Sequence, residues 1–177
     1  MRHTLIALVE DRPGALNRVL GLLRGRGLGV HSIAIGSSEK PGVKRATLLV
    51  DTDVAEQTIK QLNRLIEVLE VTDVTNVQYV VRETALVKIH APDPRREEIK
   101  TVAEGFGARI IGGSSQTIVV EMTDTPDRLG ELIEKAKGFG PCETMRSGSL
   151  AMALEAAPRR ATEERSPTWW SQADGVS

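Results

Sequence analysis

The stretch LVEDRPGALNRVLGLLRGRGLGV, residues 8–30, changes from a strand pattern to a helix pattern across the four letters DRPG at 11–14. After this turn, leucine and valine recur every three or four residues, which is the spacing of one face of an α-helix. Proline favours the first turn of a helix, whereas a glycine one position inside a helix costs roughly 0.5–1 kcal/mol relative to alanine. Gly14 therefore indicates a place where a side chain would be in the way.

The elements on either side of this turn follow the order strand, helix, strand, strand, helix, strand. The apolar patterns predict strands over 2–10, 30–38, 46–51 and 68–75 and helices over 13–26 and 55–66. This order is the split βαβ, or ferredoxin-like, arrangement of an α+β protein. Residues 1–78 are therefore predicted to form one ferredoxin-like module.

The same order recurs in the second half of the chain. Strands are predicted over 84–91, 108–115, 116–124 and 143–154, and helices over 94–105 and 126–137. The letters repeat as well, since GRGLGV at 25–30 is matched by GFGARI at 105–110. We therefore predict two tandem βαββαβ modules, 1–78 and 79–155, and a disordered polar tail over 156–177.

The composition argues against several classes of protein. The 177 residues carry a net charge of −1 and contain 3% aromatic residues, so neither a basic nucleic-acid surface nor the aromatic sheet of an RNA-binding module is expected. Cys142 is the only cysteine, which rules out an internal disulfide and disfavours a cysteine-based metal site. No stretch approaches the roughly 20 apolar residues of a membrane span, and the N-terminus lacks a signal pattern, so a cytoplasmic protein is expected.

The turn at 11–14 has the chemistry of a binding site for a free amino acid. The start of a helix presents unpaired N–H groups and the positive end of the helix dipole, which favour a carboxylate. Gly14 would let such an anion approach the backbone, and Asp11 could receive an ammonium group. Two structural explanations are open at this point: Asp11 caps its own helix, or Pro13 and Gly14 form nothing more than a turn.

The strand predicted over 30–38 is expected to form a homodimer interface. In a split βαβ module this strand lies at an edge of the sheet, and its letters VHSIAIGSS include no Lys, Arg, Asp, Glu or Pro to protect that edge. Pairing with the same strand of a second copy would cover it, and a ligand at the neighbouring helix start would then touch both copies. The second module offers no equivalent site, because Glu97 and Glu98 begin its first helix and would repel a carboxylate. We expect this module to serve as a docking surface for another protein.

Several stretches, in this order along the chain, carry a family resemblance. EDRPGALNRVLGLLRGRG (10–27), HSIAIG (31–36), KQLNRLIEVLEVTDVT (60–75), VRETALVKI (81–89) and MRSG (145–148) together resemble the regulatory (small) subunits of acetolactate synthase. The resemblance covers about residues 1–155 and implies that the first module is an ACT domain, which binds valine or a related branched-chain amino acid at a dimer interface.

The resemblance also implies what the chain does and what it leaves to a partner. It implies a non-catalytic subunit that binds a separate catalytic subunit, stimulates it and confers feedback inhibition in valine, leucine and isoleucine biosynthesis. Thiamine diphosphate, FAD and magnesium would belong to that catalytic subunit, and no cofactor is expected on this chain.

Carried over by position, the resemblance implies an effector site with two parts. The turn would contribute Asp11, Pro13, Gly14, Ala15 and Leu16, and the start of the next strand would contribute Gly29, Val30 and His31. The sequence departs from the family at Asp11 and at Gly29, because the family typically has asparagine at both positions. The departures imply valine sensing that is weaker, altered in selectivity or absent.

Two alternatives to this function follow from the residues. An enzyme in its own right is not indicated, because His3, His31 and His90 fall on separate predicted strands and nothing pairs Cys142 with a base. A stand-alone amino-acid sensor acting on another protein is the alternative that shares the turn chemistry. Trp169-Trp170 in the tail is either an exposed pair without a role or a short docking motif.

Overall fold

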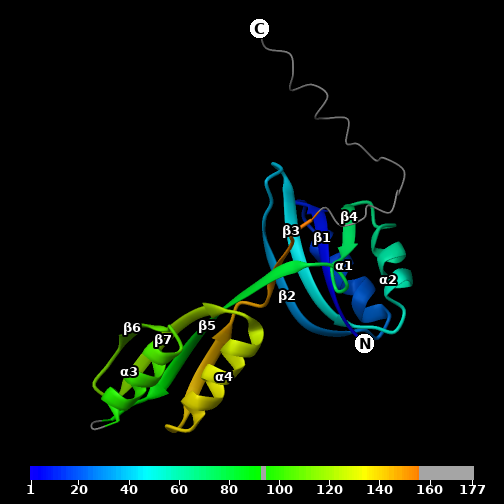
Figure 1. The fold of residues 1–177 in the computed structure, drawn as a ribbon. Helices are drawn as coiled ribbons and strands as arrows, with labels where there is room; N and C mark the ends of the chain where they lie inside the picture. Colours follow the sequence, from blue (N-terminus) through cyan, green and yellow to red (C-terminus); the bar gives the residue numbers. More distant parts are fainter. Residues whose placement is uncertain (93–94, 156–177) are drawn as a thin grey trace.

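Strand β1 (Arg2–Glu10) is an inner strand of the first antiparallel sheet, in a computed structural model that describes residues 1–92 and 95–155. The elements that follow it are α1 (Ala15–Gly25), β2 (Gly29–Ser37), β3 (Val43–Asp51), α2 (Ala55–Leu62) and β4 (Val68–Asp73). The strand order is β2-β3-β1-β4, with both helices on one face (Figure 1). Strand β2 therefore lies at an edge of the sheet, as the sequence predicts.

The second half of the chain repeats this arrangement. Its elements are β5 (Tyr79–His90), α3 (Arg96–Gly105), β6 (Arg109–Gly113), β7 (Thr117–Asp124), α4 (Pro126–Lys137), β8 (Cys142–Arg146) and β9 (Leu150–Ala153). The main path of the second sheet is β6-β7-β5-β8, the same order as in the first. The α+β class and the two tandem ferredoxin-like modules are thus confirmed.

Each module has its own aliphatic core between the sheet and the helices. In the first, Leu5, Leu23 and Leu48 are almost completely buried, and in the second Val87 and Leu129 are fully buried. Because successive strand residues point to opposite faces, the odd-numbered residues of β1 face α1 and α2 while Ile6 faces away from them. The first sheet therefore has a second face that needs a cover.

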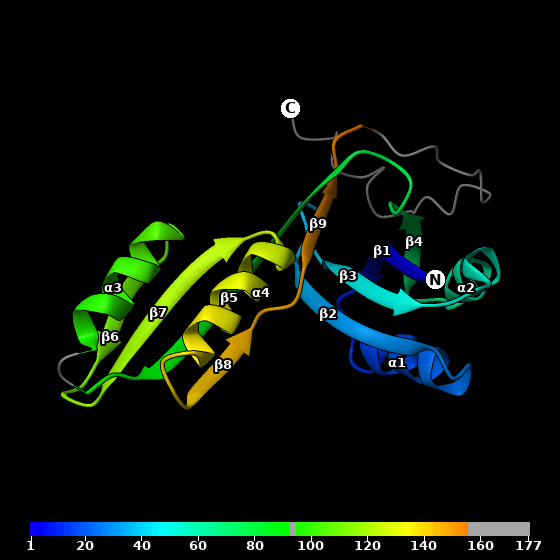
Figure 2. The ribbon, with the colours of Figure 1, turned by 60° about the horizontal axis from the view of Figure 1, so that its bottom comes forward.

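The end of the chain supplies that cover, and here the sequence-based prediction is wrong. A single strand over 143–154 was expected to close the second module, but the structure divides it into β8 and β9. Gly148 has φ +78, a left-handed conformation that turns the strand, and β9 pairs with the first residues of β5 instead. Figure 2 shows β9 leaving the second sheet and lying beside the first.

Helix α2 is also shorter than predicted, since it ends at Leu62 and not at Ile66. Two i→i+3 hydrogen bonds, from Arg64 N to Gln61 O and from Leu65 N to Leu62 O, tighten the chain after the helix. Within the described residues, none of the helices has the length and apolar character of a membrane span. The expectations for residues 156–177, including Trp169-Trp170, lie outside the described residues.

Candidate functional site

The backbone conformation of Gly14 explains why a glycine stands at the start of α1. Gly14 is the N-cap of α1, with φ +83 and ψ −12, so its backbone is in the left-handed region that glycine adopts without strain. It therefore precedes the helix, whereas the sequence placed it one position inside. Among the described residues other than Gly14 and its two chain neighbours, no atom lies within 4 Å of the place where a Cβ would be, so the space in front of this backbone is open.

The first turn of α1 has free hydrogen-bond donors. Ala15 N donates to Arg12 O at 3.2 Å, but within the described residues no acceptor takes the N–H groups of Leu16 and Asn17, and no side chain caps the helix. Free N–H groups and the positive end of the helix dipole favour an anion such as a carboxylate.

Asp11 is engaged elsewhere, so the explanation that it caps its own helix is wrong. Its Oδ2 lies 3.2 Å from Lys44 Nζ, and its backbone N–H donates to Gly42 O at 2.8 Å. Its side chain remains 54% exposed. The carboxylate of Asp11 is therefore held at the turn, beside a cation of β3, and is still open to a ligand.

The buried carboxylate of Glu67 contacts Arg18, in the first turn of α1. Glu67 forms an ion pair with Arg18 of α1, its side chain is 9% exposed, and its Oε2 has no hydrogen-bond partner among the residues that the structure describes. The Glu67 carbonyl accepts from Glu10 N at 2.8 Å, which ties the end of β1 to the start of β4. The Arg18–Glu67 ion pair therefore fixes the position of α1 relative to the sheet.

The left-handed conformation of Gly14 predicts how substitutions there change the free energy of unfolding. Gly14→Ala is expected to lower the free energy of unfolding by about 1–2 kcal/mol, because alanine in the left-handed region is strained. Gly25→Ala is the matched control, since Gly25 also has open space around it but a negative φ within α1, and it should stabilise by about 0.5–1 kcal/mol. Urea unfolding of the two variants measures both; a Gly14→Ala protein as stable as the wild type would contradict this explanation.

The second part of the predicted site begins β2. Gly29 lies opposite Asp51 of β3, and the register between the strands shifts between Val30 and Ser32, so His31 occupies a bulge. His31 Nε2 lies 2.5 Å from Asp51 Oδ2, and this hydrogen bond lowers the pKa of the exposed Asp51 carboxyl below its usual value. Val30 is 40% exposed, which leaves an apolar side chain open at the edge.

The two parts of the site do not meet within one chain. Asp11, Pro13, Gly14, Ala15 and Leu16, the helix-start group, follow the end of β1, where Glu10 pairs with Val43. Gly29, Val30 and His31, the strand-start group, lie at the other end of the sheet, where Asp51 pairs with both Gly29 and Arg2. Strand β1 spans nine residues, so the groups are separated by roughly 26 Å.

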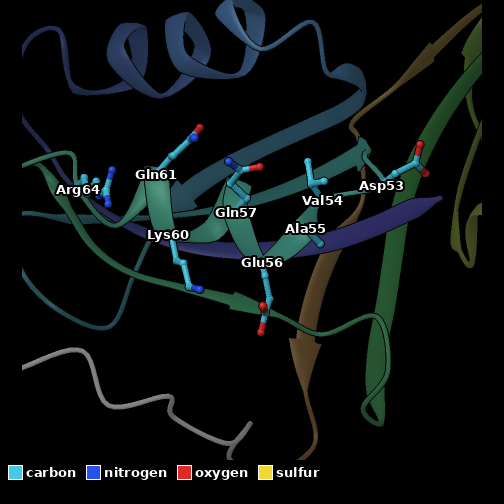
Figure 3. A pocket seen from close by; sticks show the side chains of 8 residues that line it. All are labelled: Asp53, Val54, Ala55, Glu56, Gln57, Lys60, Gln61 and Arg64. Carbon is cyan, nitrogen blue, oxygen red and sulfur yellow. The ribbon is translucent and has the colours of Figure 1, made fainter.

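A shallow groove along α2 contains none of the predicted site residues. Figure 3 shows the side chains that line it: Asp53, Val54, Ala55, Glu56, Gln57, Lys60, Gln61 and Arg64. These belong to one flank of a surface helix and to the turn on either side of it, and they carry both signs of charge. The groove therefore does not provide the convergent donors that the helix-start group provides.

Sequence reasoning missed the charged neighbours of both groups. Lys44 of β3 contacts Asp11. Asp51 of β3 contacts both His31 and Arg2. These contacts form because β3 pairs with β1 and β2. These contacts join residues far apart in the chain. They depend on the strand register, which the letters of one strand do not specify.

Comparison with known proteins identifies the class of the first module and then the family of the chain. Residues 5–70 match the family model of the AHAS small subunit-like ACT domain, and residues 82–155 match that of the small subunit of acetolactate synthase. The first module is thus an ACT domain. Taken together, the two matches show that the chain belongs to the acetolactate synthase small-subunit family, which confirms the resemblance.

Relatives from distant organisms match along nearly their whole length. The chain is 40% identical over 154 residues to the probable acetolactate synthase small subunit of Archaeoglobus fulgidus, which covers 86% of this chain and 96% of that one. It is 40% identical over 157 residues to the small subunit of Bacillus subtilis, which covers 86% and 91%. The crystal structure of the Thermotoga maritima small subunit matches with a TM-score of 0.80 at 30% identity, over 89% of this chain and 99% of that one.

Proposed function

We propose that the chain is the non-catalytic regulatory subunit of a thiamine-dependent acetolactate synthase, which it stimulates and makes sensitive to a branched-chain amino acid. The observation that carries the proposal is the match of both modules, 5–70 and 82–155, to the small-subunit family. Thiamine diphosphate, FAD and magnesium are assigned to the catalytic subunit. Affinity purification of the tagged chain from its native extract tests the pairing: a thiamine-dependent synthase should copurify, and its absence would contradict the proposal.

The effector site is proposed to form between two copies of the chain. Within the described part of the chain, strand β2 pairs on one side only, with β3, and its letters GVHSIAIGS carry no Asp, Glu, Lys, Arg or Pro. Antiparallel pairing of two β2 strands about a two-fold axis would bring the Gly29 end of one strand beside the Ser37 end of the other. Ser37 pairs with Lys44, whose side chain contacts Asp11, so the helix-start group lies at that end. Pairing would thus join the two parts of the site.

The groups so joined have the chemistry to hold a branched-chain amino acid. The carboxylate would lie on the free N–H groups of Leu16 and Asn17, where Gly14 leaves room for it. The ammonium would approach Asp11, whose carboxylate is partly exposed. Val30 of the second copy would supply an apolar surface for the aliphatic side chain. We propose valine as the effector, because its carboxylate, ammonium and branched apolar side chain match these three contacts in chemistry.

The dimer is tested by placing a charge on the β2 edge. Ile35 lies on β2 and is 40% exposed. Ile35→Lys is expected to convert the dimer to a monomer at micromolar concentration, because it places a charged side chain on the edge that pairs, near His31 of the second copy. Ile66→Lys, at a 72% exposed isoleucine after α2, is the matched control and should remain a dimer. Sedimentation velocity measures both; a dimeric Ile35→Lys protein would count against this interface.

A further inference from the structure

Two signature stretches of the sequence, VRETALVKI and MRSG, meet in the structure. Arg146 forms a two-point ion pair with Glu83, with Nε 3.0 Å from Oε1 and Nη2 2.6 Å from Oε2. The side chain of Glu83 is 6% exposed, so the pair is anchored in the protein. Ser147 N donates to Thr84 O at 2.9 Å, and Thr84 N donates to Ser147 Oγ at 3.0 Å. The segment Arg146–Ser149, which we name the joint, is thereby fixed to β5.

The other side of the joint packs against β2 of the first module. A Cβ at Gly148 would lie 2.8 Å from Ser32 Oγ and 3.1 Å from Ile33 O, so a side chain there would force Ser32 or the joint to move. Ser149 is buried, and its N–H donates to Ser32 Oγ at 3.2 Å. A shift of Ser32 would therefore press directly on the backbone of the joint.

Strand β9 extends this contact across the sheet. Ala151 N donates to Thr47 Oγ1 of β3 at 3.2 Å, and Ala151 is buried with Ile6 and Val74 on the face that α1 and α2 leave open. The other edge of β9 pairs with β5 (Figure 2). The chain thus runs from the second sheet, through the joint, to a closely packed contact on the first.

Ser32 is also the residue that ends the bulge of β2. The register shift between Val30 and Ser32 places His31, a member of the strand-start group, directly beside the residue that the joint contacts. A ligand that changes the bulge would change the position of Ser32. We infer that the joint couples the strand-start group to the second module, so that a displacement of β2 is passed through Gly148 and Ser149 to Arg146 and β5. The coupling role rests on the proposed effector function.

The contact itself is tested without ligand, by amide hydrogen exchange followed by NMR on the full chain. Gly148→Ala and Ser32→Ala should each speed exchange at Ser149 about tenfold, because the first forces the joint away from β2 and the second removes the acceptor. Gly107→Ala is the matched control: Gly107 has φ +74, close to the +78 of Gly148, but no atom within 4 Å. Unchanged exchange at Ser149 in both test variants, or equal acceleration in Gly107→Ala, would overturn the inference.

The coupling is tested by repeating the exchange with valine. In the wild type, valine should slow exchange both at residues 30–34 and at Ser149, whereas in Gly148→Ala it should slow exchange at 30–34 alone. Slowing at both places in Gly148→Ala, or at 30–34 alone in the wild type, would overturn the coupling. If valine slows exchange at neither place in the wild type, both the effector proposal and the coupling fail. The exchange measured without ligand still decides whether the joint holds β2.

Discussion

The purified chain is expected to convert no pyruvate to acetolactate, and its addition to the catalytic subunit is expected to raise that subunit's turnover about tenfold. A tenfold rise in turnover requires the regulatory subunit to lower the activation free energy of its partner's reaction by only ~1.4 kcal/mol, which is a modest share of the energy of a protein interface. Acetolactate formation is measured while the chain is titrated into a fixed amount of catalytic subunit.

The shape of the titration curve tests the assignment as directly as the rise in activity does. Activity should saturate at a fixed molar ratio of the two proteins, because a defined complex has a defined composition. An unrelated protein of equal size, added at the same concentrations, controls for non-specific stabilisation. Turnover by the chain alone, or activity that stays flat across the titration, would contradict the assignment.

The second large effect is expected from restoring the two asparagines of the family. Asp11→Asn combined with Gly29→Asn should lower the valine concentration for half-inhibition about five- to tenfold. An asparagine oxygen at position 11 still accepts a hydrogen bond from the ligand ammonium but no longer repels the ligand carboxylate, and the second change adds a polar side chain. The structure accommodates the new side chain: a Cβ at Gly29 would contact Asp51 Cβ at 3.5 Å, an ordinary distance, and Gly29 does not have a positive φ.

A matched double variant controls for changes in charge and backbone alone. Asp53→Asn with Gly112→Asn removes one exposed carboxylate and replaces one glycine that has open space around it, both outside the proposed site. This control should be inhibited like the wild type. Equal inhibition of the Asp11→Asn, Gly29→Asn protein and the wild type would mean that these two positions do not face the effector.

The local sequence predicted the fold well where a pattern lies within one element. The turn at 11–14, the strand over 2–10 and the helix from Pro126 to Lys137 all agree with the structure, since each depends on nearby residues. The division of 143–154 into two strands was not predicted, because the pairing of β9 with the start of β5 joins residues about seventy positions apart. Gly148, within the polar stretch Arg146–Ser149, was the local signal for this division.

The open helix start was predictable from the sequence, but the arrangement of the helix-start and strand-start groups was not. Proline and glycine before an apolar helix indicated an open helix start, and the free N–H groups of Leu16 and Asn17 agree with that expectation. The sequence did not indicate that the left-handed φ of Gly14 was the reason for the glycine. Nor did it show that the helix-start and strand-start groups lie at opposite ends of the sheet, which depends on the direction in which β2 runs beside β3.

This separation of the two groups allows a mixed-dimer measurement. Leu16→Glu would place a carboxylate at the free N–H groups of the helix start, and Val30→Trp would fill the space at the strand start without placing a charge on the β2 edge. Each should abolish valine binding in its own homodimer, because the first repels the ligand carboxylate and the second occupies the space of the ligand side chain. Sedimentation first establishes that both variants remain dimers.

The decisive measurement is isothermal titration calorimetry of valine with the two variants mixed in equal amounts and allowed to exchange subunits. If each site takes its helix start from one copy and its strand start from the other, every mixed dimer regains one intact site, and binding returns with wild-type affinity at one site per mixed dimer. If the mixture binds no valine, the site is not shared between copies in this way, and the central claim is contradicted.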